Sequence, residues 1–423
     1  MTLRNDVLHI SFFFLLFSFQ IQAQINQNDL QENITEIKSI DASGDENIGF
    51  DILSQKIGDS RIVMLGEQTH GHGTTFIAKT RIIKYLVENL GFDVLAFESG
   101  FYEINKLWDC DLMLSKKIDS TKKEIYGIWS RTEEFKPLIN YVMERNANGK
   151  RLDLSGFDCK HEAQYGQKNY VMDFDKFLLE SQIKLPSDYT KFKILLESLV
   201  KDDIESKVNS KQIVLFNSVL ELIKIEIQRL KKSSETEFWN QELKSLKKQA
   251  RSCWVLSKLK GLSRFVARDS AMAENLLWLA NTKFKGRKII VWAASFHIAK
   301  GKEYFETNKR FDVSNLETMG NVVDKNLPKQ VYTLGFISSE GSYGEWYSKN
   351  SPSYPINRSP SSLEALIAKT TYNFAFIDLR TLKNEEPFNM AGIDYFEGKA
   401  TWNKIFDGLF YIRQMKPPTY IKK

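Results

Sequence analysis

Short apolar runs of strand length alternate with amphipathic segments of helical period along most of the chain. Residues 61–65 (RIVML) and 93–97 (DVLAF) are apolar runs that flank residues 75–90, whose helical pattern ends at Gly91. Two apolar strands joined by a helix predict a parallel pair with a right-handed crossover. Further runs of strand length follow at residues 151–157, 288–293, 330–337, 373–378 and 407–413. The sequence therefore predicts an α/β fold in which a mostly parallel central sheet is flanked by helices.

The pattern changes between residues 165 and 262, where the strand signals disappear. Residues 213–232 (IVLFNSVLELIKIEIQRLKK) carry apolar side chains at helical spacing, with lysine on the outer face. We expect an all-helical insertion, or cap, of about a hundred residues. This insertion would divide the α/β core into residues 24–164 and 263–423.

The first 23 residues have the pattern of a secretory signal peptide. Arg4 precedes an apolar run at residues 10–19, and Ala23 supplies a small residue for cleavage. That run is too short to cross a bilayer, and no later segment is long and apolar enough to do so. No cysteine lies where a lipoprotein signal requires one. We therefore expect export to the periplasm or the extracellular space, without a membrane anchor.

Composition narrows the class of protein. The 423 residues are 42% apolar and 26% charged, which is typical of a folded chain and excludes a disordered or fibrous one. Much of the net charge of +6 is lysine spread over helical faces, so we expect no nucleic-acid partner. The cysteines, Cys110, Cys159 and Cys253, allow at most one disulfide and lack the spacing of a zinc site.

Titratable residues gather where the predicted strands end. They are Glu67, His70 and His72 after the first strand, Glu98 at the end of the second, and His297 after the strand at 288–293. Because the carboxyl ends of parallel strands meet at one edge of a sheet, we expect these side chains to share a polar pocket. A neutral imidazole that a carboxylate orients can take a proton from water. The cluster therefore predicts hydrolytic chemistry, with His70 as the base and Glu67 or Glu98 as its partner.

Other interpretations of the same residues stay open at this point. The imidazoles and carboxylates would also suit Zn²⁺ or Mn²⁺ in a metal-dependent hydrolase. A non-catalytic envelope protein that holds haem or another apolar ligand under the helical insertion is a further alternative. A serine hydrolase is not expected, because Ser99 and Ser295 lie at strand ends without the G-x-S-x-G motif.

Several motifs resemble those of the erythromycin esterase family. GEQTHG at residues 66–71 carries the GE-x-x-HG pattern, and GFDVLAFESG at residues 91–100 carries the glutamate that ends the next strand. Further similar blocks are IWSRTEEF at 128–135, LSGFD at 154–158, RDSAMAENLLWL at 268–279, IVWAASFHI at 290–298 and GFISSEGSYG at 335–344. These blocks span the predicted sheet, whereas the helical insertion is largely unmatched.

The resemblance implies a hydrolytic α/β fold whose known members open the lactone of macrolide antibiotics by water attack, without a covalent serine intermediate. In that family the histidine of GE-x-x-HG, here His70, is the proposed general base. Glu67 and Glu98 match acidic positions of the site. His297 matches the last histidine of the family's W-A-H-N-x-H block, and we expect it to protonate the leaving alkoxide.

The chain departs from the family pattern at Ala294, where many members carry the first histidine of that block. We expect the missing group to be absent or to be supplied by another residue, for which His72 is a candidate. Lys79 or Arg131 would stabilise the oxyanion. The residues expected to contact the substrate are His72, Lys79, Arg131, Asp158 and Arg268. The sequence thus predicts an exported hydrolase that cleaves an ester or lactone of a small molecule, without a cofactor unless a metal ion takes part.

Overall fold

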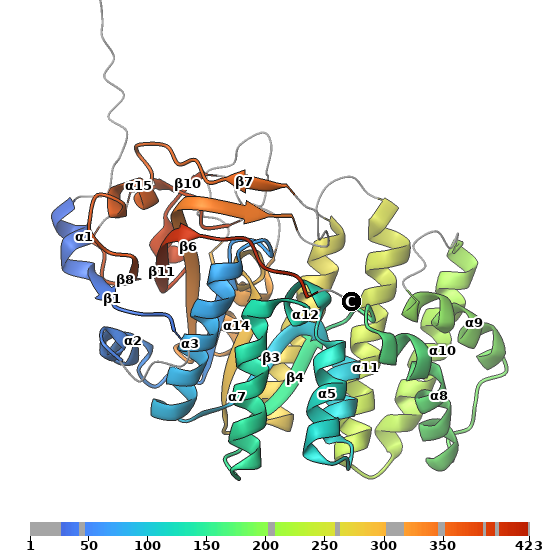
Figure 1. Ribbon diagram of the computed structural model, residues 1–423. Helices are drawn as coiled ribbons and strands as arrows, with labels where there is room; N and C mark the ends of the chain where they lie inside the picture. Colours follow the sequence, from blue (N-terminus) through green and yellow to red (C-terminus); the bar gives the residue numbers. More distant parts are fainter. Residues whose placement is uncertain are drawn as a thin grey trace, which may run out of the picture.

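A mixed sheet of nine strands lies at the centre of the part of the chain that the structure describes (Figure 1). The computed structural model describes residues 27–41, 47–201, 208–258, 263–301, 317–345, 352–383, 386–393 and 397–421. The strand order is β1-β8-β11-β6-β2-β5-β3-β4, and β7 pairs with the end of β6. The predicted signal peptide, residues 1–23, lies outside the described residues.

The strands of this sheet are β1 (Ile34–Ile37), β2 (Ile62–Glu67), β3 (Phe92–Gly100), β4 (Asp153–Asp158), β5 (Lys288–Ala294), β6 (Val331–Gly344), β7 (Ser353–Pro355), β8 (Phe374–Asp378) and β11 (Gly408–Met415). A separate pair is formed by β9 (Phe388–Met390) and β10 (Gly398–Ala400). Strands β11, β6, β2, β5, β3 and β4 are mutually parallel, whereas β8 is antiparallel to both β1 and β11. The predicted fold class, a mostly parallel sheet flanked by helices, is confirmed.

Helices cover both faces of the sheet. They are α1 (Gln27–Asn33), α2 (Phe50–Ile57), α3 (Gly73–Asn89), α4 (Phe101–Asp109), α5 (Leu114–Glu124), α6 (Gly127–Ser130), α7 (Lys136–Ala147), α12 (Ser263–Trp278), α13 (Ser295–Ile298), α14 (Met319–Asn326) and α15 (Leu363–Ile367). Alternate residues of β2 enter different cores, since Met64 lies in one buried cluster with Met272 of α12 and Leu65 in another with Phe76 of α3. Because both faces are buried, the inner strands β2 and β5 are almost continuously apolar in sequence.

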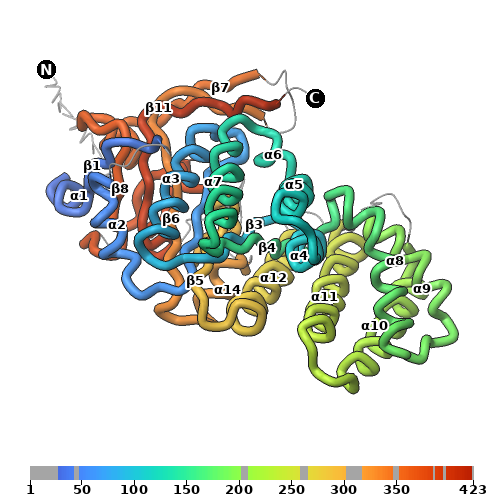
Figure 2. The backbone as a smooth tube through the Cα atoms, turned by 60° about the horizontal axis from the view of Figure 1, so that its bottom comes forward, coloured from blue at the N-terminus to red at the C-terminus, as the bar shows by residue number. Residues whose placement is uncertain are grey.

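Four helices lie at one end of the molecule, beside α4 and α5 (Figures 1 and 2). They are α8 (Gln164–Glu180), α9 (Tyr189–Val200), α10 (Ser210–Arg229) and α11 (Ser234–Ala250), and we call them the helical segment. Phe174 and Trp239 of this segment belong to the same buried cluster as Met64 and Val94 of the sheet. Among the described residues, no helix has the length and apolar character needed to cross a membrane. Cys110, Cys159 and Cys253 form no disulfide in the part of the chain that the structure describes.

A buried polar cluster joins the helical segment to the core. His161 follows β4 and contacts Glu103 of α4, with His161 Nδ1 2.9 Å from Glu103 Oε1. On its other side, His161 Nε2 lies 3.6 Å from Glu242 Oε1 of α11. Burial raises the pKa of Glu242 to about 8, although the His161 charge opposes this shift. Burial lowers the pKa of His161, but the Glu103 carboxylate outweighs this effect and raises it above its ordinary value.

The cluster predicts that stability falls as pH rises. Glu242 keeps its proton in the folded state up to about pH 8, whereas in the unfolded chain it releases the proton near 4.5. The unfolded state then binds fewer protons, so the melting temperature should fall by several degrees between about pH 5 and about pH 8. His161 acts in the same direction, because its raised pKa stabilises only the protonated form. In Glu242→Gln the melting temperature should depend less steeply on pH than in the wild type, as measured by thermal unfolding at a series of pH values.

Glu237→Gln is the matched control for this prediction, because Glu237 lies on the same helix and is only partly buried. The melting temperature of Glu237→Gln should depend on pH as steeply as that of the wild type. An equal slope for Glu242→Gln and the wild type would contradict the assignment of this pH dependence to the buried cluster.

Candidate active site

Glu67, the last residue of β2, is the centre of one half of the site. Its side chain is fully buried; Oε1 accepts a hydrogen bond from Trp129 Nε1 at 2.9 Å and lies 3.2 Å from His70 Nδ1. Oε2 accepts a hydrogen bond from Lys79 Nζ. Burial acts to raise the pKa of Glu67, but the charges of Lys79 and His70 outweigh it and hold the pKa below its ordinary value. An anionic Glu67 therefore faces His70.

This contact fixes the orientation of the His70 ring. With Nδ1–H directed at the carboxylate, Nε2 is the nitrogen that carries the lone pair of the neutral imidazole. The edge of the ring meets Trp129, with ring centroids 5.4 Å apart and planes at 85°. The side chain is 23% exposed, so it is in contact with solvent as well as with Glu67. His70 thus has the partner and the access that a general base requires.

Lys79, on α3, lies behind Glu67 rather than in front of it. It is fully buried and also donates to the carbonyl oxygen of Ala293 at 3.0 Å, with its Nζ 4.6 Å from the centre of the Trp292 ring. Burial lowers the pKa of Lys79, although Glu67 opposes this shift. A fully buried side chain has no surface with which to touch a substrate. The structure therefore gives Lys79 a positioning role on Glu67, which differs from the expected contact with substrate or oxyanion.

Glu98, near the end of β3, is the centre of the other half. Its Oε1 accepts a hydrogen bond from Arg268 Nη2 at 2.7 Å, and its Oε2 accepts one from the backbone N–H of Ala294 at 3.0 Å. Arg268 also donates to Asp158, at the end of β4, through Nε at 3.0 Å and Nη2 at 2.5 Å. Burial acts to raise the pKa values of Glu98 and Asp158, but nearby cations outweigh it and hold both below their ordinary values. Both carboxyl groups are therefore anionic.

His297, on α13, is held between two carboxylates. Its Nδ1 lies 2.7 Å from Asp269 Oδ1, and its Nε2 lies 3.1 Å from Glu98 Oε1. Burial acts to lower the pKa of His297, but Asp269 and Glu98 outweigh it and raise the pKa to about 10. At neutral pH His297 is therefore an imidazolium, which can donate a proton but has no lone pair for a metal ion. Arg268 Nη1 lies 3.1 Å from Nε2, so two cations share Glu98.

Strand β5 connects the two halves, because it lies between β2 and β3 in the sheet. Its last residue, Ala294, pairs in register with Glu67, while its N–H binds Glu98. Ala294, where the family resemblance leads us to expect a histidine, thus lies between the two glutamates. The His70 charge also contributes to the lowered pKa of Glu98, so the two halves are coupled electrostatically.

His72 does not join the two glutamates. It is fully buried at the start of α3, and its ring lies 6.2 Å from that of Tyr343 on β6. Burial, with a further contribution from the Arg358 charge, lowers the pKa of His72 to about 3. A neutral, fully buried imidazole beside β6 is not placed to replace the histidine that Ala294 lacks or to contact a substrate.

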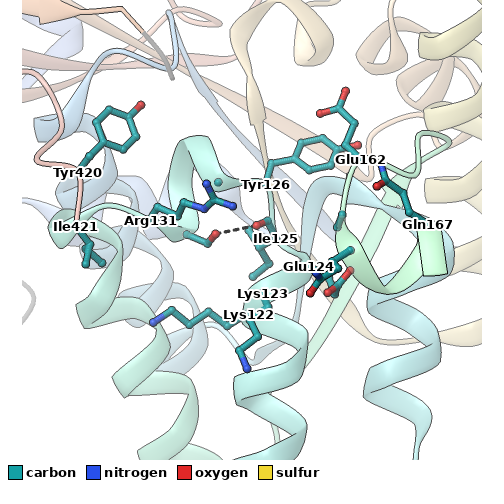
Figure 3. A pocket seen from close by; sticks show the side chains of 14 residues that line it. Lys122, Lys123, Glu124, Ile125, Tyr126, Arg131, Glu162, Gln167, Tyr420 and Ile421 are labelled. Carbon is teal, nitrogen blue, oxygen red and sulfur yellow. Dashed lines mark hydrogen bonds between the residues drawn. The ribbon is translucent and has the colours of Figure 1, made fainter. Parts of the chain in front are cut away.

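Arg131 also lies apart from the two glutamates. It is an exposed residue at the end of α6 that lines a cavity of about 860 Å³ together with Tyr126 (Figure 3). Tyr126 connects this cavity to the site, because its hydroxyl donates to Asp158 Oδ2 at 2.9 Å. Arg131 faces this neighbouring space, and its expected contact with the oxyanion stays a prediction.

Sequence comparison assigns the chain that carries this site to a family. The family model described as erythromycin esterase matches residues 87–415, which is well over half of the chain. The chain belongs to the erythromycin esterase family. The matched region contains Glu98, Asp158, Arg268 and His297, whereas the turn with His70 precedes it. The resemblance inferred from the sequence motifs is confirmed.

Two relatives of this erythromycin esterase family member span nearly its whole length. It is 28% identical over 410 residues to a protein named putative hydrolase YbfO of Bacillus subtilis (strain 168), covering 90% of each chain. It is 22% identical over 394 residues to erythromycin esterase type II of Escherichia coli, covering 86% of this chain and 92% of the relative.

Solved structures share the fold of this erythromycin esterase family member. One described as a succinoglycan biosynthesis protein superposes with a TM-score of 0.75 at 22% identity, covering 94% of this chain and 98% of that one. A mutant erythromycin esterase in its open conformation superposes with a TM-score of 0.64 at 15% identity, covering 90% and 98% of the two chains. At such identities the likeness extends to the fold alone.

Three residues of the site in this erythromycin esterase family member were not predicted from the sequence. Trp129 and Tyr126 bind Glu67 and Asp158 through side-chain donors, and Asp269 binds His297. A signal existed for Asp269, because it belongs to a charged Arg–Asp pair near the start of an otherwise mainly apolar helix. Nothing in the spacing distinguishes the two aromatic residues from ordinary core residues.

Metal binding was the alternative interpretation of the same residues. Within the described ranges, no three or more histidine, cysteine, aspartate or glutamate side chains are grouped so that they would hold a metal ion. The donor set also fits poorly, since His297 is protonated on both nitrogens and Glu67 is engaged by Lys79 and Trp129.

Proposed function

We propose that this chain is a hydrolase that directs water at the carbonyl carbon of an ester or lactone in a small molecule. The observation that carries the proposal is the contact of a buried, anionic Glu67 with the solvent-accessible His70, at 3.2 Å. A carboxylate that orients an imidazole and stabilises its charged form is the arrangement that general-base catalysis needs. Membership of a family with hydrolases among its named relatives supports the same conclusion.

The proposed reaction assigns one proton transfer to each histidine. His70 Nε2 takes a proton from water, and the resulting hydroxide attacks the carbonyl carbon. When the tetrahedral intermediate collapses, the C–O bond to the leaving group breaks and the imidazolium of His297 protonates the alkoxide. The positive charges of Arg268 and His297 would stabilise the oxyanion that forms between these steps. Ester and water thus become acid and alcohol, and proton exchange with solvent returns His70 to its neutral form and His297 to its imidazolium form.

We further propose that the protein acts after export, since the first 23 residues have the composition of a signal peptide. The substrate would then be met in the periplasm or outside the cell. Macrolide lactones are proposed substrates because of the family relationship, and simple esters test the reaction independently of that relationship.

The test is a substrate screen with the purified chain from Gln24 onward, using macrolide lactones and simple esters in ¹⁸O-labelled water. We expect turnover without an initial burst, label in the product acid, and no effect of a chelator. Loss of activity with the chelator would favour a metal-dependent hydrolase. A burst of alcohol release would indicate a covalent intermediate and contradict direct water attack.

A further inference from the structure

The cavity that contains Arg131 lies next to the active site but is formed by different elements. Its walls come from the end of α5, from α6, from the start of α8 and from the C-terminal residues Tyr420 and Ile421 (Figure 3). Residues in and just before α6 border both the cavity and the site. Trp129 donates to Glu67 on one side, while Tyr126 lines the cavity and donates to Asp158.

The cavity wall carries three cations, Lys122, Lys123 and Arg131, and we call the cavity the basic pocket. None of the three is within 4.0 Å of a carboxylate belonging to another described residue. Two acidic residues, Glu124 and Glu162, also line the pocket, and the charge of Lys123 acts on Glu124. Glu162 pairs with Lys160 at 2.6 Å, and Glu124 accepts a hydrogen bond from the N–H of Tyr165 at 2.9 Å while burial raises its pKa to about 7.

Arg131 is held in position although its side chain is exposed. Its carbonyl oxygen accepts a hydrogen bond from the N–H of Ile421 at 2.8 Å, which attaches the C-terminal segment to the pocket wall. Its side chain lies across Gly127, where an added Cβ would come within 3.0 Å of Arg131 Nε. A larger residue at this position would displace the guanidinium. The pocket thus presents a guanidinium and two ammonium groups beside two acidic residues that also bind Lys160 and the N–H of Tyr165.

We propose that the basic pocket binds a carboxylate on the part of the substrate that is not cleaved, so that the substrate is an ester or lactone with an acidic substituent. This inference rests on the proposed hydrolytic function. Arginine can bind a carboxylate with two parallel hydrogen bonds, and the lysines add charge at the same wall.

The experiment compares two esters of equal length, the mono-p-nitrophenyl ester of glutarate and p-nitrophenyl valerate. The first carries a carboxylate at the end of the acyl chain, and the second ends in a methyl group. The wild type should have a higher kcat/KM for the glutarate ester, and this preference should weaken as salt is added. Arg131→Gln and Lys122→Gln should each lower the preference about tenfold.

Lys116→Gln is the matched control, because Lys116 is an exposed residue of the same helix, α5, outside the pocket. It should keep the preference of the wild type. Equal kcat/KM for the two esters, or a preference that survives both pocket substitutions, would overturn the inference while leaving the hydrolytic proposal intact. The use of two separate pocket variants keeps the test valid if one of them fails to fold.

Calorimetric titration with glutarate measures anion binding to the basic pocket independently of ester hydrolysis. Glutarate should bind the wild type, and its affinity should fall about tenfold in Arg131→Gln. This result would support anion binding in the basic pocket even if neither ester were hydrolysed. The lack of hydrolysis would then contradict only the proposed function. Where the glutarate ester is hydrolysed, glutarate should inhibit competitively. Non-competitive inhibition would show that the anion is not part of the substrate and would overturn the inference, as would the absence of glutarate binding.

Discussion

His70→Ala is expected to lower kcat by about 100-fold to 10,000-fold, which is the usual contribution of one positioned general base. Its melting temperature should stay close to that of the wild type, because the side chain is partly exposed and Glu67 keeps its contacts with Lys79 and Trp129 without it. Steady-state kinetics on any ester found in the screen, together with thermal unfolding, measure the two effects. Unchanged turnover would remove His70 from the mechanism.

His72 provides the control within the same turn. It is fully buried and lies against Tyr343, so His72→Asn should lower the melting temperature while the kcat of the folded fraction changes little. The two histidines, two residues apart in sequence, are therefore expected to show opposite effects on activity and stability. Equal losses of kcat in both variants would point to a general disturbance of the turn rather than to proton transfer by His70.

The apolar pattern was sufficient to predict the central sheet, because the strands that hold the site are buried on both faces. The run at 61–65 became β2 and the run at 93–97 became β3, each buried almost throughout. Strand β1 was not predicted, since its four residues, ITEI, are short and mostly half-buried at the sheet edge. The antiparallel direction of β8 was also missed, because a strand run does not encode its own direction.

The candidate site was predicted in part, through the residues whose position at a strand end is visible in sequence. Glu67, Glu98 and Asp158 all lie at or near the carboxyl ends of parallel strands, as expected. The role of Lys79 was not predictable, because lysine is rarely fully buried and only the fold shows it beneath Glu67. Arg131 was expected at the oxyanion; it lines the neighbouring cavity, and its contact with a substrate stays a prediction.

Arg268→Gln is expected to reduce both stability and activity. Arg268 binds the buried carboxylates of Glu98 and Asp158 at 2.7 Å and 2.5 Å, and its loss leaves two anions without their guanidinium partner. Removing one partner from a buried ion pair costs about 3–5 kcal/mol of unfolding free energy. Because Arg268 is also proposed to stabilise the oxyanion, kcat should fall by about 100-fold to 1,000-fold. Urea unfolding and steady-state kinetics measure the two losses separately.

Arg287 is the matched control at the opposite end of the same strands. It joins Asp93 at the start of β3 to Asp153 at the start of β4, at 2.9 Å and 2.5 Å. Arg287→Gln should cost about 1–3 kcal/mol, less than Arg268→Gln because this ion pair is more exposed, and it should leave kcat unchanged. A loss of kcat in Arg287→Gln as large as in Arg268→Gln would show that activity follows the stability of the sheet rather than the chemistry at its carboxyl edge.

The pH dependence of the Arg268→Gln defect distinguishes lost charge pairing from lost packing. Glu98 and Asp158 have lowered pKa values in the wild type, so they stabilise the fold above their unfolded values of 4.5 and 3.8, and this contribution is lost as pH falls through the folded values. Without the guanidinium, both groups protonate at higher pH and the buried charges disappear. The difference in unfolding free energy between wild type and variant should therefore narrow below about pH 4. A difference independent of pH would mean that Arg268 stabilises the site through its packed side chain and not through its charge.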